Sequence, residues 1–254
     1  MSPHSILIAE KFRGPPTSGN GGYVAGVFAD ALTGGVHCLP NRDAVEVTLR
    51  APTPLNQTLT TSLSDAKLAV RHGDTLIAEA TVKPLPLDIP TAATWAEAMS
   101  VREHSYSFPL GINPLFDTPL RGVHPICFCC GTELSPAEGT HVYSAPFHAK
   151  KQVVAAWIPG EALAGAANCV RPEFIWTALD CPGQMAWRAE GVYTGMLGRL
   201  TARIEKPVRV GERCVVIGWT LGVEGKKYFA GTALFNEANE LCAYAKAVWI
   251  GKFN

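Results

Sequence analysis

The sequence predicts an α+β protein in which one unit, a helix followed by a run of short antiparallel strands, occurs twice. Three observations support this prediction. A helix with a regular apolar stripe near the amino terminus precedes about four strand-like segments. The same order returns after a proline-rich stretch, and short motifs from the two halves can be aligned. A chain of 254 residues is long enough for one large domain or two small ones.

The first helix is predicted over Asn20–Leu32, after a short strand within residues 5–13. Its apolar residues recur at helical spacing and predict one buried face: Val24, Val27, Phe28, Ala31 and Leu32. Beside them lies a row of small residues that would let the helix lie very close to a sheet: Gly22, Ala25, Gly26 and Ala29. Ser18 or Asn20 is the expected N-cap, because either side chain can accept a hydrogen bond from the first helical turn.

The strands that follow are short, rich in β-branched residues and bounded by turns: Ala44–Arg50, Gln57–Leu63, Lys67–Arg71 and Thr75–Lys83. The turn His72-Gly73-Asp74 predicts a hairpin between the last two. Prolines then interrupt regular structure as far as residue 126, apart from one short helix within Thr94–Arg102. We therefore expect an amino-terminal unit over residues 1–84, a connection over 85–126 that crosses the molecule, and a carboxy-terminal unit over 127–254.

The second half repeats the order of the first. Strands are predicted at His141–Ala145 and Gln152–Ile158, and a helix at Arg171–Asp180 with Pro172 at its favoured first position. Phe174, Ala178 and Leu179 should face inward, and Cys181-Pro182-Gly183 should interrupt or kink the helix. The remaining strands are predicted at Leu197–Glu205, Glu212–Leu221, Lys226–Phe235 and Glu240–Ile250.

Two pairs of segments align between the halves. "TLRAPTPLNQTLT" resembles "RIEKPVRVGERCV", because in each a strand ends, a proline follows (Pro52 or Pro207), and a short loop leads into the next strand. "GDTLIAEATV" resembles "ANELCAYAKAV", since each is a turn followed by an alternating strand. A repeat of about 100 residues indicates duplication of a domain and not a solenoid.

Composition excludes several classes of protein. The formal net charge is zero and no basic run occurs, which argues against nucleic acid or an anionic membrane as the main partner. No apolar stretch approaches the roughly 20 residues of a membrane span, and the start of the chain lacks the features of a secretory signal. Eight scattered cysteines predict reduced thiols in a cytoplasmic protein. No Gly-x-Ser-x-Gly elbow, Walker loop or dinucleotide fingerprint occurs, and no cofactor is expected.

The arrangement resembles the double hotdog fold, in which two curled antiparallel sheets each wrap a central helix. "GNGGYVAGVFADAL" is similar to the Gly-Gly helix entry of acyl-CoA thioesterases of the thioesterase II type, and "FIWTALDCPG" to their second helix, which carries an acidic residue. "KPVRVGE" and "GTALFNEANELCAYAKAVWI" resemble their closing strands. The resemblance covers nearly all of the chain except the proline-rich connection. It also implies that Asp180 matches the family's helix aspartate, whereas Leu197 and Ala247 stand where the family has Thr and Gln.

Thioester hydrolysis needs an activated water, donors for the developing oxyanion and an apolar slot for the acyl chain. Asp180 is the candidate base, because a carboxylate in an apolar helix is costly unless it is paired or functional. The N–H groups of Gly21 and Gly22 are candidate donors to the thioester carbonyl. Tyr23 could line the slot or donate its hydroxyl, and Asn20 could orient a water. Asp30, on the first helix, is an alternative acid.

Each of these residues also has a structural interpretation. The glycines could serve only tight helix–sheet packing, Asp180 could hydrogen-bond the backbone at the kink, Asn20 could act as a cap, and Tyr23 could belong to the core. The segment Cys127-Phe128-Cys129-Cys130-Gly131 contains a C-x-x-C spacing compatible with half a zinc site. No second pair completes four ligands in the sequence, so buried thiols at a turn are the favoured interpretation and no metal is expected.

The sequence thus predicts a thioesterase that hydrolyses an acyl thioester, with acyl-CoA or an acyl-carrier thioester as its partner. Two alternatives remain. One is a hydratase or dehydratase of enoyl or β-hydroxyacyl thioesters, although neither predicted helix carries the histidine usual for that chemistry. The other is an acyl-CoA binding protein without catalysis, for which the missing Thr and Gln would account. A homodimer of two double hotdogs is possible.

Overall fold

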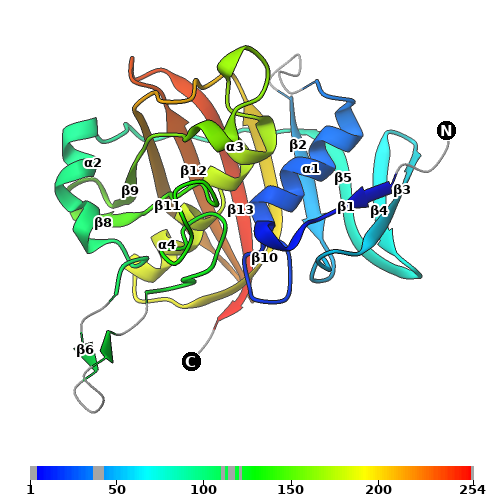
Figure 1. Ribbon diagram of the computed structural model, residues 1–254, viewed down its shortest axis with the longest axis horizontal. Helices are drawn as coiled ribbons and strands as arrows, with labels where there is room; N and C mark the ends of the chain where they lie inside the picture. Colours follow the sequence, from blue (N-terminus) through cyan, green and yellow to red (C-terminus); the bar gives the residue numbers. More distant parts are fainter. Residues whose placement is uncertain (1–4, 37–42, 110–111, 114–117, 120–121, 253–254) are drawn as a thin grey trace.

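The fold is built on one antiparallel sheet of eleven strands, with helices packed against both of its faces (Figure 1). The computed structural model describes residues 5–36, 43–109, 112–113, 118–119 and 122–252. The strand order is β1-β3-β4-β5-β2-β10-β13-β12-β11-β9-β8. These strands are β1 (Ser5–Leu7), β2 (Asp43–Leu49), β3 (Thr58–Ser64), β4 (Lys67–His72), β5 (Thr75–Pro84), β8 (Ala145–Phe147), β9 (Gln152–Trp157), β10 (Thr194–Ile204), β11 (Cys214–Glu224), β12 (Lys227–Phe235) and β13 (Leu241–Lys252). The short strands β6 (Ile112–Asn113) and β7 (Thr118–Pro119) pair separately.

Within the described ranges four α-helices accompany the sheet: α1 (Gly21–Thr33), α2 (Trp95–Val101), α3 (Pro172–Ala178) and α4 (Cys181–Ala189). Short 3-10 turns lie at Glu10–Phe12, Arg102–His104, His148–Lys150, Glu161–Leu163 and Ala166–Asn168. The helix predicted at Asn20–Leu32 is α1, and Asn20 is its N-cap. The break predicted after residue 180 is also present, because α3 ends at Ala178 and α4 begins at Cys181. Phe174, Ala178 and Leu179 are buried, as the sequence predicts.

Two predicted strands differ from the structure. Residues 5–13 form a strand only at Ser5–Leu7, after which the chain turns into the 3-10 helix Glu10–Phe12. The strand predicted at His141–Ala145 is wrong, because β8 begins only at Ala145. His141 has a φ of 56°, and a residue in this left-handed region cannot continue an extended strand.

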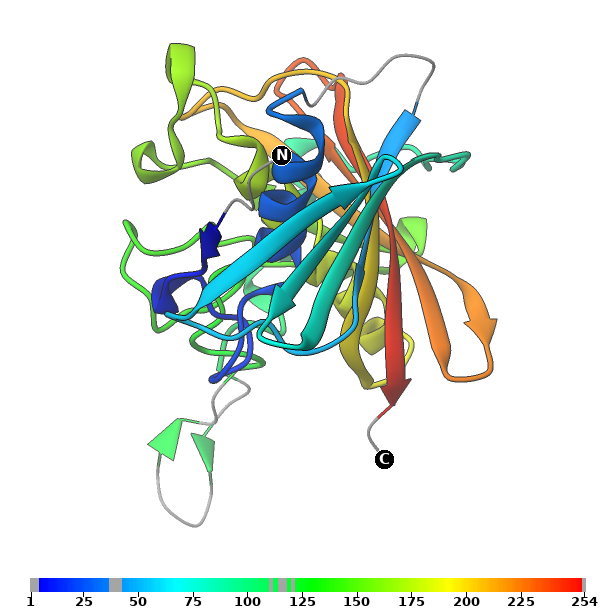
Figure 2. The same cartoon turned by 90° about the vertical axis from the view of Figure 1, so that its right-hand side faces the viewer.

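The strands of both halves belong to one continuous sheet, where the sequence predicts two. The join is between β2 and β10, whose antiparallel register runs from Arg199↔Thr48 to Ala202↔Val45. Side chains reinforce it, since Arg199 Nε donates to Thr48 Oγ1 at 3.0 Å. Figure 2 shows the strands of the first half passing across α1. The strands of the two halves are therefore joined by β2–β10 pairing into one uninterrupted sheet.

The two faces of the sheet have different covers. On one face the main core lies between the sheet and the helices α1 and α3, and it includes Val216 of β11. The neighbours of Val216 along that strand, Val215 and Ile217, belong to a second core with residues that follow β5 and with α2. Since successive side chains of a strand point to opposite faces, α2 and the connecting segment cover the other side of the sheet. Residues between 85 and 101 of the predicted connection thus lie against the face of the sheet opposite to α1 and α3.

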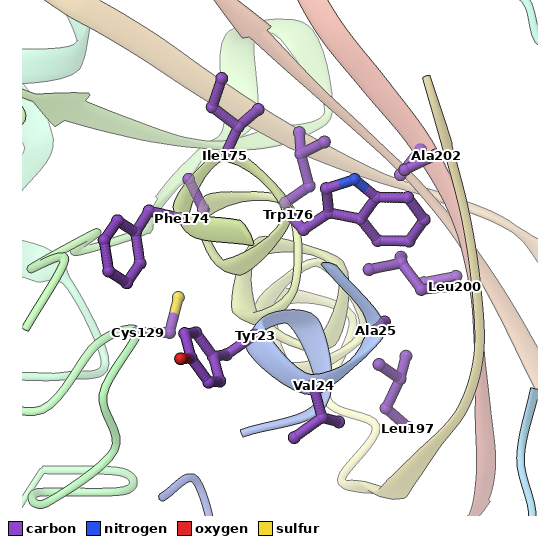
Figure 3. Packing of buried hydrophobic residues seen from close by; sticks show 14 of the residues in the cluster. Tyr23, Val24, Ala25, Cys129, Phe174, Ile175, Trp176, Leu197, Leu200 and Ala202 are labelled. Atoms are coloured by element: carbon purple, nitrogen blue, oxygen red, sulfur yellow. The ribbon is translucent and has the colours of Figure 1, made fainter. Parts of the chain in front are cut away.

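The glycines of α1 face another helix. A Cβ at Gly22 would lie 2.6 Å from Trp176 O, and one at Gly26 would lie 2.7 Å from Glu173 Cα, both in α3. The sequence predicts close approach to a sheet, and the structure shows close approach to a helix. Trp176 then fills the space between α3 and β10 beside Leu200 and Ala202, as Figure 3 shows.

Candidate active site

The start of α1 is the first component of the site. Asn20 caps the helix, because its Oδ1 accepts a hydrogen bond from the backbone N–H of Tyr23 at 2.9 Å. Its amide nitrogen points the other way and donates to Asp180 Oδ2 at 2.9 Å. The backbone N–H of Gly22 donates to the same oxygen at 2.8 Å. A carboxylate from the second half of the chain is therefore bound at the positive end of a helix from the first half.

Asp180 reaches this position because the second helix breaks there. Pro182 has no N–H and its ring clashes with a helical carbonyl four residues earlier, so α3 cannot run on into α4. Thr232 Oγ1 donates to the carbonyl of Leu179 at 2.9 Å, which satisfies a backbone group exposed by the break. The side chain of Asp180 makes no capping bond to α4 and extends toward α1.

Burial dominates the electrostatics of Asp180. The residue is 3% exposed, and burial raises its pKa to about 7, although the N–H of Gly22 and the amide of Asn20 lower it. Both of these donors bind Oδ2. Oδ1 is buried and has no hydrogen-bond partner among the described residues. A buried acceptor without a donor is costly, so Asp180 is under-satisfied in a place where a ligand could complete its hydrogen bonding.

A cavity of about 240 Å³ lies beside Asp180. Four parts of the chain line it: residues between 14 and 21 before and at the start of α1, residues 49–53 at and after the end of β2, His124, and residues from 127 onward. Its polar lining includes the side chains of Asn20, Asp180 and Gln184. Its apolar lining includes Leu49, Met196, Leu197, Trp249 and Ile250. The cavity can therefore hold a ligand with a polar reacting group and an apolar tail.

The two glycines of the helix entry occupy different places. Gly21 lines the cavity, and as the first helical residue its N–H has no acceptor within the helix. The N–H of Gly22 is already bonded to Asp180, and a Cβ at Gly22 would lie 2.6 Å from the Cβ of Asp180. Gly22 thus lets the backbone approach the carboxylate, while Gly21 presents a backbone donor at the cavity.

Tyr23 lies on the far side of the helix start, in a cluster of aromatic rings. Its ring stacks on Phe12 with centroids 3.9 Å apart and meets Phe128 and Phe174. Burial, and next the charge of Glu173, raise the pKa of Tyr23 to about 12, so its hydroxyl stays protonated. Tyr23 is not among the residues that line the cavity. The structure places its ring in the core that supports the helix entry.

Of the other residues singled out in the sequence, one lines the cavity and two lie away from it. Leu197 lines the cavity, whereas Ala247 is buried in β13 and does not. Asp30 is exposed, two and a half turns along α1 from the site. No helix of the described residues is long and apolar enough to cross a membrane.

Two of the cavity residues that the sequence did not reveal contact each other, His124 and Gln184. His124 Nε2 and Gln184 Oε1 lie 3.0 Å apart, and Gln184 Nε2 donates to the carbonyls of Thr194 and Gly195. Gln184 lies in the part of α4 that the sequence analysis left unassigned after the break. A helical stripe after Pro182 is the signal that could have shown it. His124 carries no comparable signal, because it stands in an irregular stretch with a φ of 54°.

Four buried thiols lie at the inner end of the site. Cys127, Cys130 and Cys181 have sulfur atoms within 4.8 Å of one another, and Cys129 Sγ donates to Thr177 O at 3.1 Å. Asn20 Nδ2 donates to Cys127 Sγ at 3.6 Å. Hydrogen bonds from Cys130 and then from Cys181 hold the pKa of Cys127 well below its usual value. The C-x-x-C segment thus touches the residues that hold Asp180, although the sequence places the two far apart.

Sequence comparison gives no relatives for this chain: no family model matches it, and no curated protein matches it. Solved structures do. A thioesterase structure from Novosphingobium aromaticivorans has a TM-score of 0.61 at 13% identity and covers 99% of this chain and 96% of its own. A thioesterase II structure from Thermobifida fusca has a TM-score of 0.61 at 10% identity, covering 100% and 93%. The tesB protein of Mycobacterium avium subspecies paratuberculosis has a TM-score of 0.59 at 10% identity, covering 98% and 92%. Over nearly its whole length, the chain has the fold of these thioesterase structures.

Proposed function

We propose that this protein hydrolyses an acyl thioester, with acyl-CoA as the substrate class, and that its sheet and helices form two hotdog units. The units are residues 1–84 and 127–254, joined by residues 85–126. The observation that carries the proposal is the position of Asp180. A buried carboxylate from one half is held at the helix start of the other half, beside a cavity lined by both polar and apolar side chains. The fold shared with thioesterase structures supports the same activity.

In this proposal each residue has a defined role. Asp180 Oδ1 accepts a proton from the attacking water, because Oδ2 is already bound to Asn20 and Gly22. Gly21 N–H, at the positive end of α1, donates to the thioester oxygen as charge develops on it. Asn20 and Gly22 fix the carboxylate, and the aromatic ring of Tyr23 supports the turn that carries them. The acyl chain lies against Leu197, Trp249 and Ile250.

Without the Thr and Gln of the thioesterase II pattern, other residues must position the aspartate and the water. Leu197 lines the cavity and cannot orient a water. The amide that contacts the aspartate is instead that of Asn20, which comes from the helix entry and not from a strand. We propose that Asn20 performs the positioning role that a strand residue has in the thioesterase II pattern.

The test is a panel of acyl-CoAs of increasing chain length, assayed for release of free thiol with wild-type protein and Asp180→Asn. Removing a general base typically lowers a rate by about 10²- to 10⁴-fold, and we expect a loss in that range. Asp30→Asn is the matched control, because Asp30 is an exposed acid on α1 away from the cavity, and this variant should keep its activity. Full turnover by Asp180→Asn, or no turnover by wild type on any acyl-CoA, would refute this mechanism.

A second function is favoured by one observation, the presence of His124 in the same cavity as Asp180. Hydration of an enoyl thioester uses a base that activates the water for attack on C3 and an acid that protonates C2, and a histidine with an aspartate can supply both. Loss of the absorbance of a conjugated enoyl-CoA, without release of thiol, would show this reaction. Tight binding of acyl-CoA with neither reaction would instead indicate a binding protein.

A further inference from the structure

The three thiols of Cys127, Cys130 and Cys181 form a cluster that the proposed hydrolysis does not use. Their sulfur atoms lie within 4.8 Å of one another, and all three residues are buried. Cys127 and Cys130 come from one turn, whereas Cys181 is 54 residues further than Cys127 and begins α4. The sequence shows only the C-x-x-C half of this group, and the fold supplies the third thiol.

The spacing of the sulfur atoms fits a tetrahedral metal ion. Zinc–sulfur bonds are about 2.3 Å long, and the tetrahedral angle then places two sulfur ligands about 3.8 Å apart. Cys127 Sγ and Cys181 Sγ are 3.8 Å apart. We propose that Cys127, Cys130 and Cys181 bind a zinc ion through their three thiolates.

The turn that carries two of these thiols is fixed by its backbone. The N–H of Gly131 donates to the carbonyl of Cys127 at 2.7 Å. A Cβ at position 131 would lie 2.6 Å from that carbonyl oxygen and 2.8 Å from the nitrogen of Cys127, so only glycine fits. The turn therefore holds the Cys127 and Cys130 side chains on the same side before any ion binds, which reduces the cost of ordering the ligands.

The cluster also has outer partners and an opening. Asn20 Nδ2 donates to Cys127 Sγ, and hydrogen bonds of this kind orient the ligands of metal sites. Cys127 and Cys181 line the cavity, so an ion can reach them and a water can serve as the fourth ligand on that side.

The first experiment measures metal binding by the whole protein, purified under reducing conditions. After removal of metal with a chelator, zinc is returned and the bound metal is measured by mass spectrometry of the elements. We expect one equivalent of zinc per chain. Replacement by Co²⁺ should give the thiolate-to-cobalt charge-transfer band and the intense visible bands of a tetrahedral site. Neither measurement requires a thioester, so failure of zinc binding would leave the proposed hydrolysis standing, and the reverse also holds.

The variants separate the three ligands from a buried thiol elsewhere in the protein. Cys130→Ser and Cys181→Ser should each lose at least tenfold in zinc affinity, together with the cobalt charge-transfer band. Cys214→Ser is the matched control, since Cys214 is an equally buried thiol that lies in β11 outside the cluster, and this variant should bind zinc as wild type does. Far-ultraviolet circular dichroism identifies a variant that does not fold. Alkylation of the wild-type protein then gives an independent count of the ligands. Zinc should protect the thiols of residues 127, 130 and 181 from alkylation, relative to the metal-free protein.

Three outcomes would overturn the proposal. The first is wild-type protein that binds less than one-tenth of an equivalent of zinc. The second is unchanged zinc affinity in both Cys130→Ser and Cys181→Ser. The third is a disulfide between Cys127 and Cys181 in the protein as purified, seen as a loss of two hydrogens in the intact mass and assigned to these two residues by mapping of the alkylated peptides.

Discussion

At the scale of single residues, Asn20 connects three parts of the site. Its carbonyl oxygen caps α1, and its amide nitrogen contacts both Asp180 and the thiol of Cys127. An asparagine is suited to this position because its two ends have opposite hydrogen-bonding character. Serine can replace the acceptor and cap the helix, but its short hydroxyl cannot also replace the distant donor.

This difference predicts separate effects for two substitutions. Asn20→Ser should keep the stability of the cap and lose about 10- to 100-fold in kcat/KM, since a hydrogen bond to a charged group contributes about 1.5–3 kcal/mol. Asn20→Ala should lose the same activity and, in addition, about 1 kcal/mol of unfolding free energy. Urea unfolding and thiol release measure the two quantities. Wild-type kcat/KM in Asn20→Ser would show that Asn20 does not position Asp180.

Residue identities at the site were partly predictable. Asp180 is conspicuous in sequence because it is a lone acid in an apolar helix, and the glycines are conspicuous because they stand where a helix begins. The contact between Asp180 and the Gly22 N–H spans 158 positions, and no local pattern encodes such a distance. His124 was not predicted as a cavity residue because it lies in an irregular segment, where no periodic pattern indicates which way a side chain points.

At the scale of elements, α1 and α3 are in contact through glycine. Gly26→Ala would favour an isolated helix by about 1 kcal/mol, because alanine has the higher helix propensity. In this protein the new Cβ would lie 2.7 Å from Glu173 Cα and 2.9 Å from Trp176 Cβ. We therefore expect Gly26→Ala to lower the unfolding free energy by about 1–3 kcal/mol, as overpacking does, measured as the midpoint of urea unfolding.

Gly160→Ala is the control for this substitution. Gly160 has a φ of −77°, which any residue can adopt, and the nearest atom to a Cβ there is 3.9 Å away. This variant should be as stable as wild type or slightly more stable, because alanine restricts the unfolded chain. Equal urea midpoints for Gly26→Ala and Gly160→Ala would mean that α1 and α3 can move apart to admit the new methyl group without loss of unfolding free energy.

Periodicity predicted the elements better than their partners. The apolar stripe of α1 and the alternation of the strands are local, so their positions agree with the structure within a few residues in most cases. A row of small residues on a helix indicates that another element packs closely against it, but the row does not show whether that element is a sheet or a helix. The row in α1 was predicted to lie against a sheet, and in the structure Gly22 and Gly26 of that row lie against α3. The pairing of β2 with β10 depends on the whole chain and had no sequence signal.

At the scale of the whole molecule, the shared sheet and core predict cooperative unfolding. The main core contains residues of both halves, and β2 pairs with β10 across the join. All six tryptophans lie after residue 94, so their fluorescence reports on the second half and the connection, whereas circular dichroism reports on both halves. The two signals should give the same urea midpoint, because neither half can lose its strands without exposing the other's core.

A substitution at the join tests this expectation. Leu200 is fully buried in β10 and faces the main core, so Leu200→Ala should lower the unfolding free energy by about 2–5 kcal/mol. Both signals should move together in this variant. Two separate transitions, in wild type or in Leu200→Ala, would show that the halves unfold independently.

The unequal starts of α1 and α3 limit how many ligands one chain can hold. α1 begins with Gly21, which lines the cavity, and Gly22, whose N–H donates to Asp180, whereas α3 begins with Pro172, which has no N–H to offer. Neither Pro172 nor Glu173 lines this cavity. The start of α1 is therefore the helix entry of the pair that can meet a ligand there, and one ligand per chain is the expected binding stoichiometry.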